Sequence, residues 1–169
     1  MLSALTQRRR FSDLTEQEVL ALAISSEEDD ARIYRSFAER LRKDYPASAS
    51  VFDGMAVEED GHRQRLIDLH QRRFGEVIPL IRREHVAGFY ARRPIWLSQT
   101  LSLDTIRGEA RAMEQAAQDF YTRAAARTPD AATRKLLGDL AAAEAGHERH
   151  AVGLETKHLS GDARADEDQ

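Results

Sequence analysis

The chain has 169 residues, which is enough for one domain with a sizeable hydrophobic core. Its 29 acidic and 25 basic residues give a net charge of −4, which offers no support for a nucleic-acid-binding surface. The chain contains no cysteine, so disulfides, thiol catalysis and thiolate metal sites are excluded, and any metal must be held by histidine and carboxylate side chains. Those ligands suit iron, manganese or zinc rather than copper(I) or an iron–sulfur cluster.

Residues 1–14 are expected to form a solvated N-terminal arm. The run Arg8-Arg9-Arg10-Phe11 looks like the start of a twin-arginine export signal, but the polar run 12–16 follows where a signal needs an apolar stretch. No apolar run in the sequence approaches the length that spans a bilayer. The sequence therefore favours a cytoplasmic protein.

Two amphipathic helices are predicted in the first half of the chain. Thr15 can cap the first helix, with Glu18 completing a capping box, and this helix must end before Pro46. The second helix should run from about Ser48 to Phe74, with Gly75 ending it. Their inward faces carry Leu20, Ile24, Glu27, Ala31, Tyr34, Ala38 and Leu41 on the first helix, and Phe52, Met55, Glu59, His62, Leu66 and Leu69 on the second. Each apolar face therefore holds ionisable side chains in its middle.

Residues 75–103 break the helical pattern with prolines and a glycine. A segment of that length with many apolar groups is unusual as a free linker. We therefore expect a crossover that lies on a helix bundle, with a short helix around Arg82–Ala91.

The second half of the chain repeats the helical pattern. A third helix is predicted from about Asp104 to Arg127, and Thr128-Pro129 restarts a fourth, with Thr128 as its cap and Pro129 at its first position. The fourth helix should end near Ser160-Gly161, and the polar residues 161–169 should be disordered. The inward positions are Ile106, Ala110, Met113, Glu114, Ala117, Phe120, Tyr121 and Ala124 on the third helix, and Leu136, Leu137, Leu140, Glu144, His147, Ala151 and Leu154 on the fourth. We expect residues 15–160 to form an all-α four-helix bundle with a long crossover between helices two and three.

Two Glu-x-x-His motifs stand out, Glu59 to His62 and Glu144 to His147, each with a glycine before the histidine. On a helix, residues three apart project from one face, so each motif brings a carboxylate and an imidazole to one point. A single match is common by chance in a helical, Glu-rich chain. Both motifs, however, lie seven residues after a large apolar residue, which is Phe52 or Leu137.

An internal repeat selects two further carboxylates. Superposing the first helix pair on the second matches Tyr34 with Tyr121 and Glu27 with Glu114, and each glutamate lies seven residues before its tyrosine. The two halves of the chain thus resemble one duplicated helix hairpin. The two tyrosines are interpreted as core residues that hydrogen-bond to the candidate ligands, in preference to the alternative of redox-active radicals.

The same comparison sets other acids and histidines aside. Glu28 matches Gln115, and Glu58 matches Ala143. The acids after Glu27 are therefore assigned mostly to the solvated side of the helix: Glu28, Asp29 and Asp30. The histidines outside the pattern are assigned to the surface: His70, His85, His150 and His158.

Six residues remain as candidate metal ligands: Glu27, Glu59, His62, Glu114, Glu144 and His147. A Glu or a Glu-x-x-His from each of four helices is the ligand pattern of di-iron and di-manganese carboxylate bundles. Four carboxylates balance the charge of two divalent cations, whereas without metal the acids would repel one another and take up protons. A buried hydrogen-bonded network is the alternative interpretation, but the inward faces carry no Lys or Arg to balance four acids.

These residues give the chain a resemblance to the rubrerythrin branch of the ferritin-like superfamily. More narrowly, the chain resembles the erythrin domain that precedes a vacuolar-iron-transporter-like membrane domain in membrane-bound ferritins. The resemblance covers about residues 15–158, and beside the motifs above it includes Ile78–Leu97 with Arg82, Arg83 and Trp96. It implies a ferritin-like four-helix bundle with a non-haem di-iron centre.

The chain also differs from that family. Rubrerythrins proper carry a cysteine-ligated rubredoxin domain, and this chain has no cysteine. They carry an extra glutamate one turn after the third-helix ligand, where this chain has Ala117, although Asp30 occupies the matching place on the first helix. The membrane domain is not part of these 169 residues, so either the soluble part of a longer protein or a stand-alone homologue fits.

The resemblance implies that two iron ions bind, with manganese or zinc as substitutes, and that oxygen or hydrogen peroxide oxidises Fe(II) in iron homeostasis and oxidative-stress protection. The four glutamates are then the candidate catalytic residues. The expected ligand roles are bridging for Glu59 and Glu144, terminal for Glu27 and Glu114, and binding of one iron each for His62 and His147.

Other functions fit the same residues. They are a peroxidase supplied by an outside reductant, an iron-sensing gate or adaptor for a membrane transporter, and an inert helical dimerisation domain. The iron-oxidising protein could also be the cytoplasmic part of an iron exporter, at the inner membrane. A homodimer with hairpins exchanged through the long crossover is favoured, although a closed monomer satisfies the same pattern.

Overall fold

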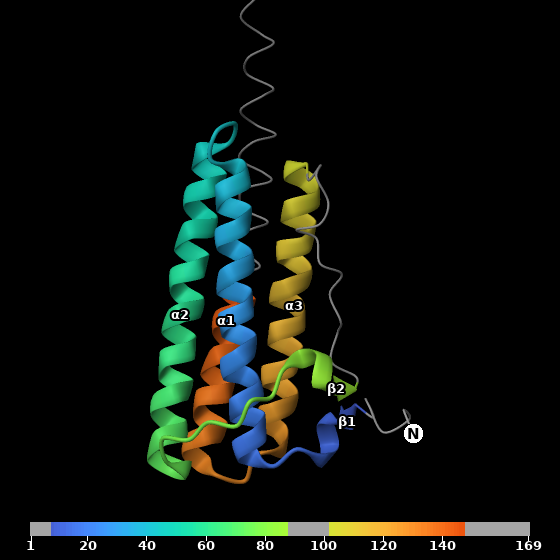
Figure 1. Cartoon of the computed structure of the whole chain (residues 1–169), viewed down its shortest axis with the longest axis vertical. Coiled ribbons are helices and arrows are strands. Elements are labelled where there is room, and N and C mark those ends of the chain that lie inside the picture. The colour runs from blue at the N-terminus through green and yellow to red at the C-terminus, as the bar shows by residue number, and fades with distance from the viewer. Residues whose placement is uncertain (1–7, 88–101, 148–169) are drawn as a thin grey trace, which may run out of the picture. The chain divides into compact units, whose positions relative to one another are not determined.

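The structure, a computed structural model, describes residues 8–87 and 102–147. These residues form three long helices and a further helical run over residues 131–147 (Figure 1). The elements are β1 (Arg9–Arg10), the 3-10 turn η1 (Phe11–Asp13), α1 (Glu16–Leu41), α2 (Pro46–Phe74), the 3-10 turn η2 (Arg83–His85), β2 (Val86–Ala87) and α3 (Leu103–Arg127). The predicted all-α class is confirmed. None of the helices in these described ranges is both long and apolar enough to cross a membrane.

The described residues divide into two compact units. The first unit comprises residues 8–40 and 49–87, and the second comprises residues 41–48 and 102–147. Each unit is built around one pair of helices, which is the duplicated hairpin that the sequence predicts.

The ends of α1 and α2 form largely as predicted. The Thr15 hydroxyl accepts a hydrogen bond from the Glu18 N–H at 3.2 Å, and the Thr15 N–H donates to the Glu18 carboxylate at 3.4 Å, which completes the capping box. Gly75 follows α2 with a φ of +88°, a conformation that glycine adopts without steric cost. α2 begins at Pro46 rather than near Ser48, because the fixed φ of proline suits the first helical turn.

α1 and α2 pack as an antiparallel pair. The rings of Tyr34 and Phe52 stack with their centroids 6.1 Å apart. At the other end of the pair, Arg73 donates two hydrogen bonds of 2.8 Å to the carboxylate of Glu16. The predicted inward positions of both helices are all buried, so their apolar side chains are removed from water.

The prediction that His70 lies on the surface is wrong. Its side chain is fully buried near the end of α2, with Nδ1 3.1 Å from the Gly75 carbonyl oxygen. Its ring also contacts Phe74, at a centroid distance of 5.6 Å. A carbonyl group next to a helix end has no partner within the helix, and the imidazole supplies one.

Part of the N-terminal arm is held against the first unit rather than solvated as predicted. β1 pairs in parallel with β2. Phe11 and Leu14 are buried, and the Arg9 guanidinium binds the Glu18 carboxylate, which lowers the pKa of Glu18. The side chains of residues 8–10 are exposed, as expected for a run of arginines.

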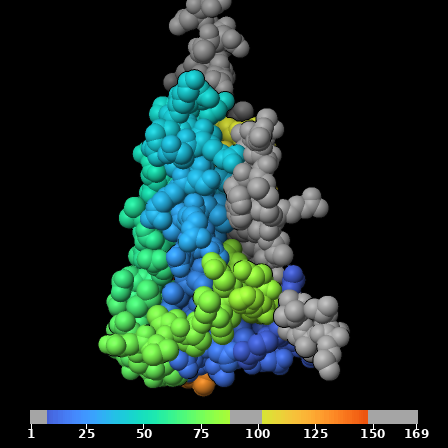
Figure 2. All heavy atoms as spheres, in the orientation of Figure 1, coloured from blue at the N-terminus to red at the C-terminus, as the bar shows by residue number. Residues whose placement is uncertain are grey.

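The described part of the crossover, residues 75–87, lies across the surface of α1 within the first unit (Figure 2). The prediction of a short helix around Arg82–Ala91 is wrong for residues 82–87, because Arg83–His85 form a single 3-10 turn and β2 follows it. Pairing with β1 uses the backbone groups that a helix would have paired internally. Residues 88–91 of the predicted helix lie outside the described residues.

In the second unit, the predicted cap of the fourth helix is wrong. Thr128 is the C-cap of α3, and the next helix begins at residue 131. Asp130 is its N-cap, because the carboxylate accepts hydrogen bonds from the Thr133 N–H at 2.9 Å and from the Thr133 hydroxyl at 3.1 Å. The predicted end of this helix near Ser160-Gly161 and the polar tail 161–169 lie outside the described residues.

Most predicted inward positions of the second unit are buried, including Leu137 and Leu140. Ala117 and Leu136 are only half-buried, because they lie at the margins of the inward face. Ala151 lies outside the described residues, as does Leu154.

Replacing Asp130 by alanine tests the revised helix start. The change removes the acceptor for the Thr133 N–H, and it is expected to lower the free energy of unfolding by about 1 kcal/mol. Urea denaturation measures this loss. The matched control is Asp139→Ala, at an exposed acid in the same helix, where we expect a change within about 0.5 kcal/mol. Equal losses in the two variants would contradict the capping role of Asp130.

Candidate metal centre

Glu27, Glu59 and His62 form a buried cluster in the first unit, which we call the first half-site. Their exposed fractions are 2%, 1% and 8%. Each offers one possible ligand atom, and these atoms lie within 4.8 Å of one another. The imidazole Nδ1 of His62 lies 3.8 Å from Oε2 of Glu27. Two carboxylates and one imidazole therefore surround one small volume.

Glu114, Glu144 and His147 form the matching cluster in the second unit, the second half-site. All three are buried, and their ligand atoms also lie within 4.8 Å of one another. Nδ1 of His147 lies 3.2 Å from Oε2 of Glu114 and 3.8 Å from Oε2 of Glu144. Each unit thus brings together the three candidate ligands that the sequence predicts for it.

Helix geometry explains how the hairpin builds the first half-site. Tyr34 and Phe52 stack across the antiparallel pair, and Glu27 and Glu59 each lie seven residues farther from the connecting turn on their own helices. Seven residues are nearly two helical turns, so both glutamates return to the face on which the helices meet. His62 lies one turn beyond Glu59 on that same face.

The burial of the neighbouring acids agrees with the selection made from the internal repeat. Glu28 and Glu58 are exposed, whereas Glu27 and Glu59 are buried. An exposed carboxylate on the outer face of a helix cannot reach a metal bound on its inner face.

The remaining candidates fall into two groups. Tyr34 and Tyr121 are buried core residues, as expected, and His85 is exposed, as predicted. His150 and His158 lie outside the described residues.

Protons compensate the buried charge of the second half-site. Burial and the neighbouring Glu144 carboxylate together raise the pKa of Glu114 to about 8, although His147 opposes the shift. Burial disfavours the charged form of His147, but hydrogen bonds with Glu114 and Glu144 outweigh it and raise the pKa of His147 to about 11. At neutral pH these side chains therefore keep protons that an incoming cation would displace.

The donor set of each half-site fits a divalent transition-metal ion. Carboxylate oxygens and imidazole nitrogens are ligands that iron, manganese and zinc accept. Two ionised carboxylates also balance the charge of one such ion. The raised pKa of Glu114 indicates that, without a cation, this buried carboxyl group keeps its proton instead.

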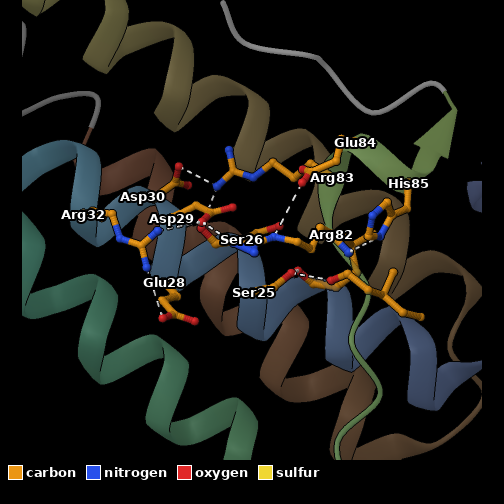
Figure 3. Close-up of polar contacts among 12 residues, drawn as sticks. Ser25, Ser26, Glu28, Asp29, Asp30, Arg32, Arg82, Arg83, Glu84 and His85 are labelled. Carbon is orange, nitrogen blue, oxygen red and sulfur yellow. Dashed lines mark hydrogen bonds and ion pairs between the residues drawn. The ribbon is translucent and has the colours of Figure 1, made fainter. Parts of the chain in front are cut away.

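Asp30 does not lie on the solvated side, where the sequence analysis placed it. Its side chain is buried and pairs with the guanidinium of Arg83 at 2.7 Å (Figure 3). A signal was available, because Asp30 lies three residues after Glu27 and therefore on a neighbouring part of the same helix face. Arg83 was missed as its partner, because the two residues are far apart in the sequence and periodicity carries no information about that pairing.

The raised pKa values predict that the metal-free protein loses stability as the pH rises. The contribution of Glu114 is fully present below its ordinary pKa of 4.5 and is lost as the pH rises through about 8. The contribution of His147 is fully present below 6.5 and is lost as the pH rises toward about 11. Thermal melts of metal-free protein at pH 5 and pH 8 should show the higher midpoint at pH 5.

A matched variant separates this effect from the rest of the titration. Glu114→Gln removes the titrating carboxyl group but keeps its shape, so the difference between the melts at pH 5 and pH 8 should shrink. Divalent metal should restore wild-type stability more at pH 8 than at pH 5. A wild-type protein that is equally stable at the two pH values, with or without metal, would contradict the crowded-carboxylate interpretation.

Comparisons with known proteins agree with a helical bundle that carries these two half-sites. Among curated proteins, none matches the chain. A solved structure described as hypothetical protein Pfu-1136390-001 from Pyrococcus furiosus has a similar fold, with a TM-score of 0.70, 23% sequence identity, and coverage of 89% of this chain and 94% of that one. The family model described as Rubrerythrin matches residues 18–155, a range that includes all six half-site residues. The chain therefore belongs to the rubrerythrin family, whose fold is the ferritin-like four-helix bundle.

Proposed function

We propose that the two half-sites together hold two iron ions in one di-iron carboxylate centre, at which oxygen or hydrogen peroxide oxidises Fe(II). The observation that carries this proposal is the duplication of the cluster. Each unit of this rubrerythrin-family chain buries two glutamates and one histidine with their ligand atoms within 4.8 Å of one another. One such set is compatible with a buried polar network, whereas two matching sets correspond to the ligands of two metal ions.

The six side chains divide into three roles in this proposal. Glu59 and Glu144 would be shared by both ions, Glu27 and Glu114 would each bind one ion as terminal carboxylates, and His62 and His147 would each supply an imidazole to one ion. Four carboxylates then balance the charge of two divalent ions, which removes most of the cost of burying them. Manganese and zinc accept the same ligands and are the expected substitutes.

Bound iron would supply the electrons for the oxidant, one from each Fe(II). The contribution of the chain is to hold the ligands in a site shielded from water, where electrostatic interactions are stronger than at the surface. At neutral pH the raised pKa values keep Glu114 as an uncharged carboxyl group and His147 as an imidazolium with a proton on each ring nitrogen. These protons leave when the same atoms bind a cation, so metal uptake should release acid.

The composition of the chain favours Fe(II) oxidation over repeated peroxide reduction. A peroxidase needs a continuing supply of electrons beyond those stored in two Fe(II) ions. These 169 residues contain no cysteine with which to hold a rubredoxin-type iron, so a peroxidase function would need a source of electrons outside them.

Wider roles follow from the proposed activity. Oxidising Fe(II) would serve iron homeostasis and would protect against oxidative stress. A cytoplasmic location, a place in an iron exporter at the inner membrane, and a homodimer with exchanged hairpins stay predictions from the sequence and from the resemblance to erythrin domains.

Metal stoichiometry tests which glutamates are ligands. Glu59→Ala should lower the number of irons bound per chain, because it removes a bridging carboxylate, whereas Glu58→Ala at the exposed neighbour should leave that number unchanged. Glu27→Ala and Glu28→Ala form a second matched pair with the same expectation. Elemental analysis after anaerobic loading and desalting gives the count. Full iron binding by Glu59→Ala would show that the metal lies on another face of the helix.

Rapid Fe(II) oxidation tests whether the centre is catalytic. Stopped-flow absorbance after mixing Fe(II)-loaded protein with oxygen, or with peroxide, should rise much faster than for free Fe(II). Glu114→Ala should lose this rapid phase while still binding some iron, because the other five ligands remain. Gln115→Ala, at the exposed neighbouring position, is the control and should behave like the wild type. A wild-type protein that holds two irons yet oxidises them no faster than free Fe(II) would favour the iron-sensing alternative.

A further inference from the structure

The crossover contacts the turn of α1 that contains Ser26 and Asp30 (Figure 3). Nη2 of Arg83 donates to the Ser26 carbonyl oxygen at 2.6 Å and to Oδ1 of Asp30 at 2.7 Å. The Ser26 carbonyl belongs to the peptide unit that joins Ser26 to Glu27, so the guanidinium binds the backbone immediately before the candidate ligand. The side chains of Arg83 and Asp30 are 9% and 7% exposed. The ion pair is therefore shielded from solvent, where such hydrogen bonds are strong.

Two outer contacts flank this buried pair. The Ser25 hydroxyl donates to the Ile81 carbonyl oxygen at 2.5 Å. Arg82 binds Asp29 at 3.3 Å, but the arginine side chain is 36% exposed, so this contact should contribute little. The crossover thus contacts α1 on both sides of Glu27, and the buried Arg83 makes the strongest of these contacts.

At the two positions of α3 that match Asp29 and Asp30, the second half-site has no side chain that can accept a hydrogen bond. In the internal repeat, Asp30 matches Ala117, and Asp29 matches Ala116. An alanine side chain cannot accept a hydrogen bond, so the carboxylate that Arg83 binds three residues after Glu27 has no counterpart three residues after Glu114. The two halves therefore share their candidate ligands but differ in what holds them.

We propose that Arg83 is a positioning residue for Glu27, and that by fixing this turn of α1 it makes the first half-site the tighter of two metal positions. A ligand that is held in place before the metal arrives loses less conformational freedom on binding, and the affinity rises accordingly. Iron should then fill the first half-site before the second. This inference rests on the proposed function, because it requires that both half-sites bind metal.

Anaerobic calorimetric titration of the full metal-free chain with Fe(II) tests the proposal. The wild type should show a tight and a weaker binding step. Glu27→Ala should remove the tight step, and Glu114→Ala should remove the weaker one. Arg83→Met combined with Asp30→Asn should weaken the tight step by about 10- to 100-fold, the usual effect of losing a partner that orients a metal ligand, and should leave the weaker step unchanged.

The choice of variants guards against a failure to fold. The double variant leaves no unpaired buried charge, whereas Arg83→Met alone would leave Asp30 buried without its cation. Should the double variant not fold, Arg83→Lys keeps the positive charge but shortens the side chain that places Nη2 between Ser26 and Asp30, and it is expected to weaken the same step less. Arg82→Gln, which changes the exposed neighbour, is the matched control and should alter neither step.

Hydrogen exchange of the metal-free protein gives a reading that does not depend on iron. The amides of residues 25–30 should exchange faster in the double variant than in the wild type or in Arg82→Gln. Unchanged exchange there, equal weakening of both binding steps, or two steps of equal affinity in the wild type would overturn the positioning role and leave the two-metal function standing. A wild type that binds no Fe(II) would instead defeat the proposed function, and with it the ranking of the two positions.

Discussion

Burying one glutamate beside another is unfavourable unless a cation or a proton compensates their charge. Each unit of this protein buries such a pair of glutamates within its helix pair: Glu27 with Glu59, and Glu114 with Glu144. In the second unit the raised pKa of Glu114 indicates that protons take the place of a cation. A chain selected for stability alone would fill these positions with apolar side chains. The clusters are therefore the part of the core where local packing rules yield to a functional requirement.

Much of the first unit keeps the two helices of the pair in register. A shift of α2 by one residue would turn its inward face by about 100° and carry Glu59 away from Glu27. Aromatic stacking of Tyr34 on Phe52 opposes such a shift near one end of the pair, and the double hydrogen bond from Arg73 to Glu16 opposes it at the other. The ligand geometry thus depends on contacts that lie about two to three helical turns from the ligands themselves.

Features set by local periodicity could be predicted from the sequence, and features set by distant partners could not. Helical spacing and the internal repeat were enough to choose Glu59 over Glu58, and the structure buries the first and exposes the second. Residues that make isolated contacts were misjudged. His70 was predicted at the surface, but it is buried against the carbonyl group of Gly75. Asp30 was predicted to be solvated, but it pairs with Arg83 of the crossover.

Competition between neighbouring residues explains the errors at element ends. Thr128 and Asp130 both have side chains that can cap a helix, and only the structure reveals that Thr128 ends α3 while Asp130 starts the next helix. Residues 82–87 could have continued as a helix, but the backbone of Arg9–Arg10 offers them a strand partner instead. No pattern within the crossover itself encodes that partner.

The parallel pair of β1 and β2 joins two points that are far apart along the chain. Arg9 lies opposite Val86, so the whole of α1 and α2 lies between the paired residues. Closing so long a loop loses conformational entropy before any contact can stabilise the pair. A helix hairpin, in contrast, forms through contacts between residues that are closer in sequence. The helices should therefore associate early in folding, and the crossover should dock late. The first half-site would then be assembled in two stages. The helix hairpin would first bring the ligands together, and docking of the crossover would later make their positions rigid.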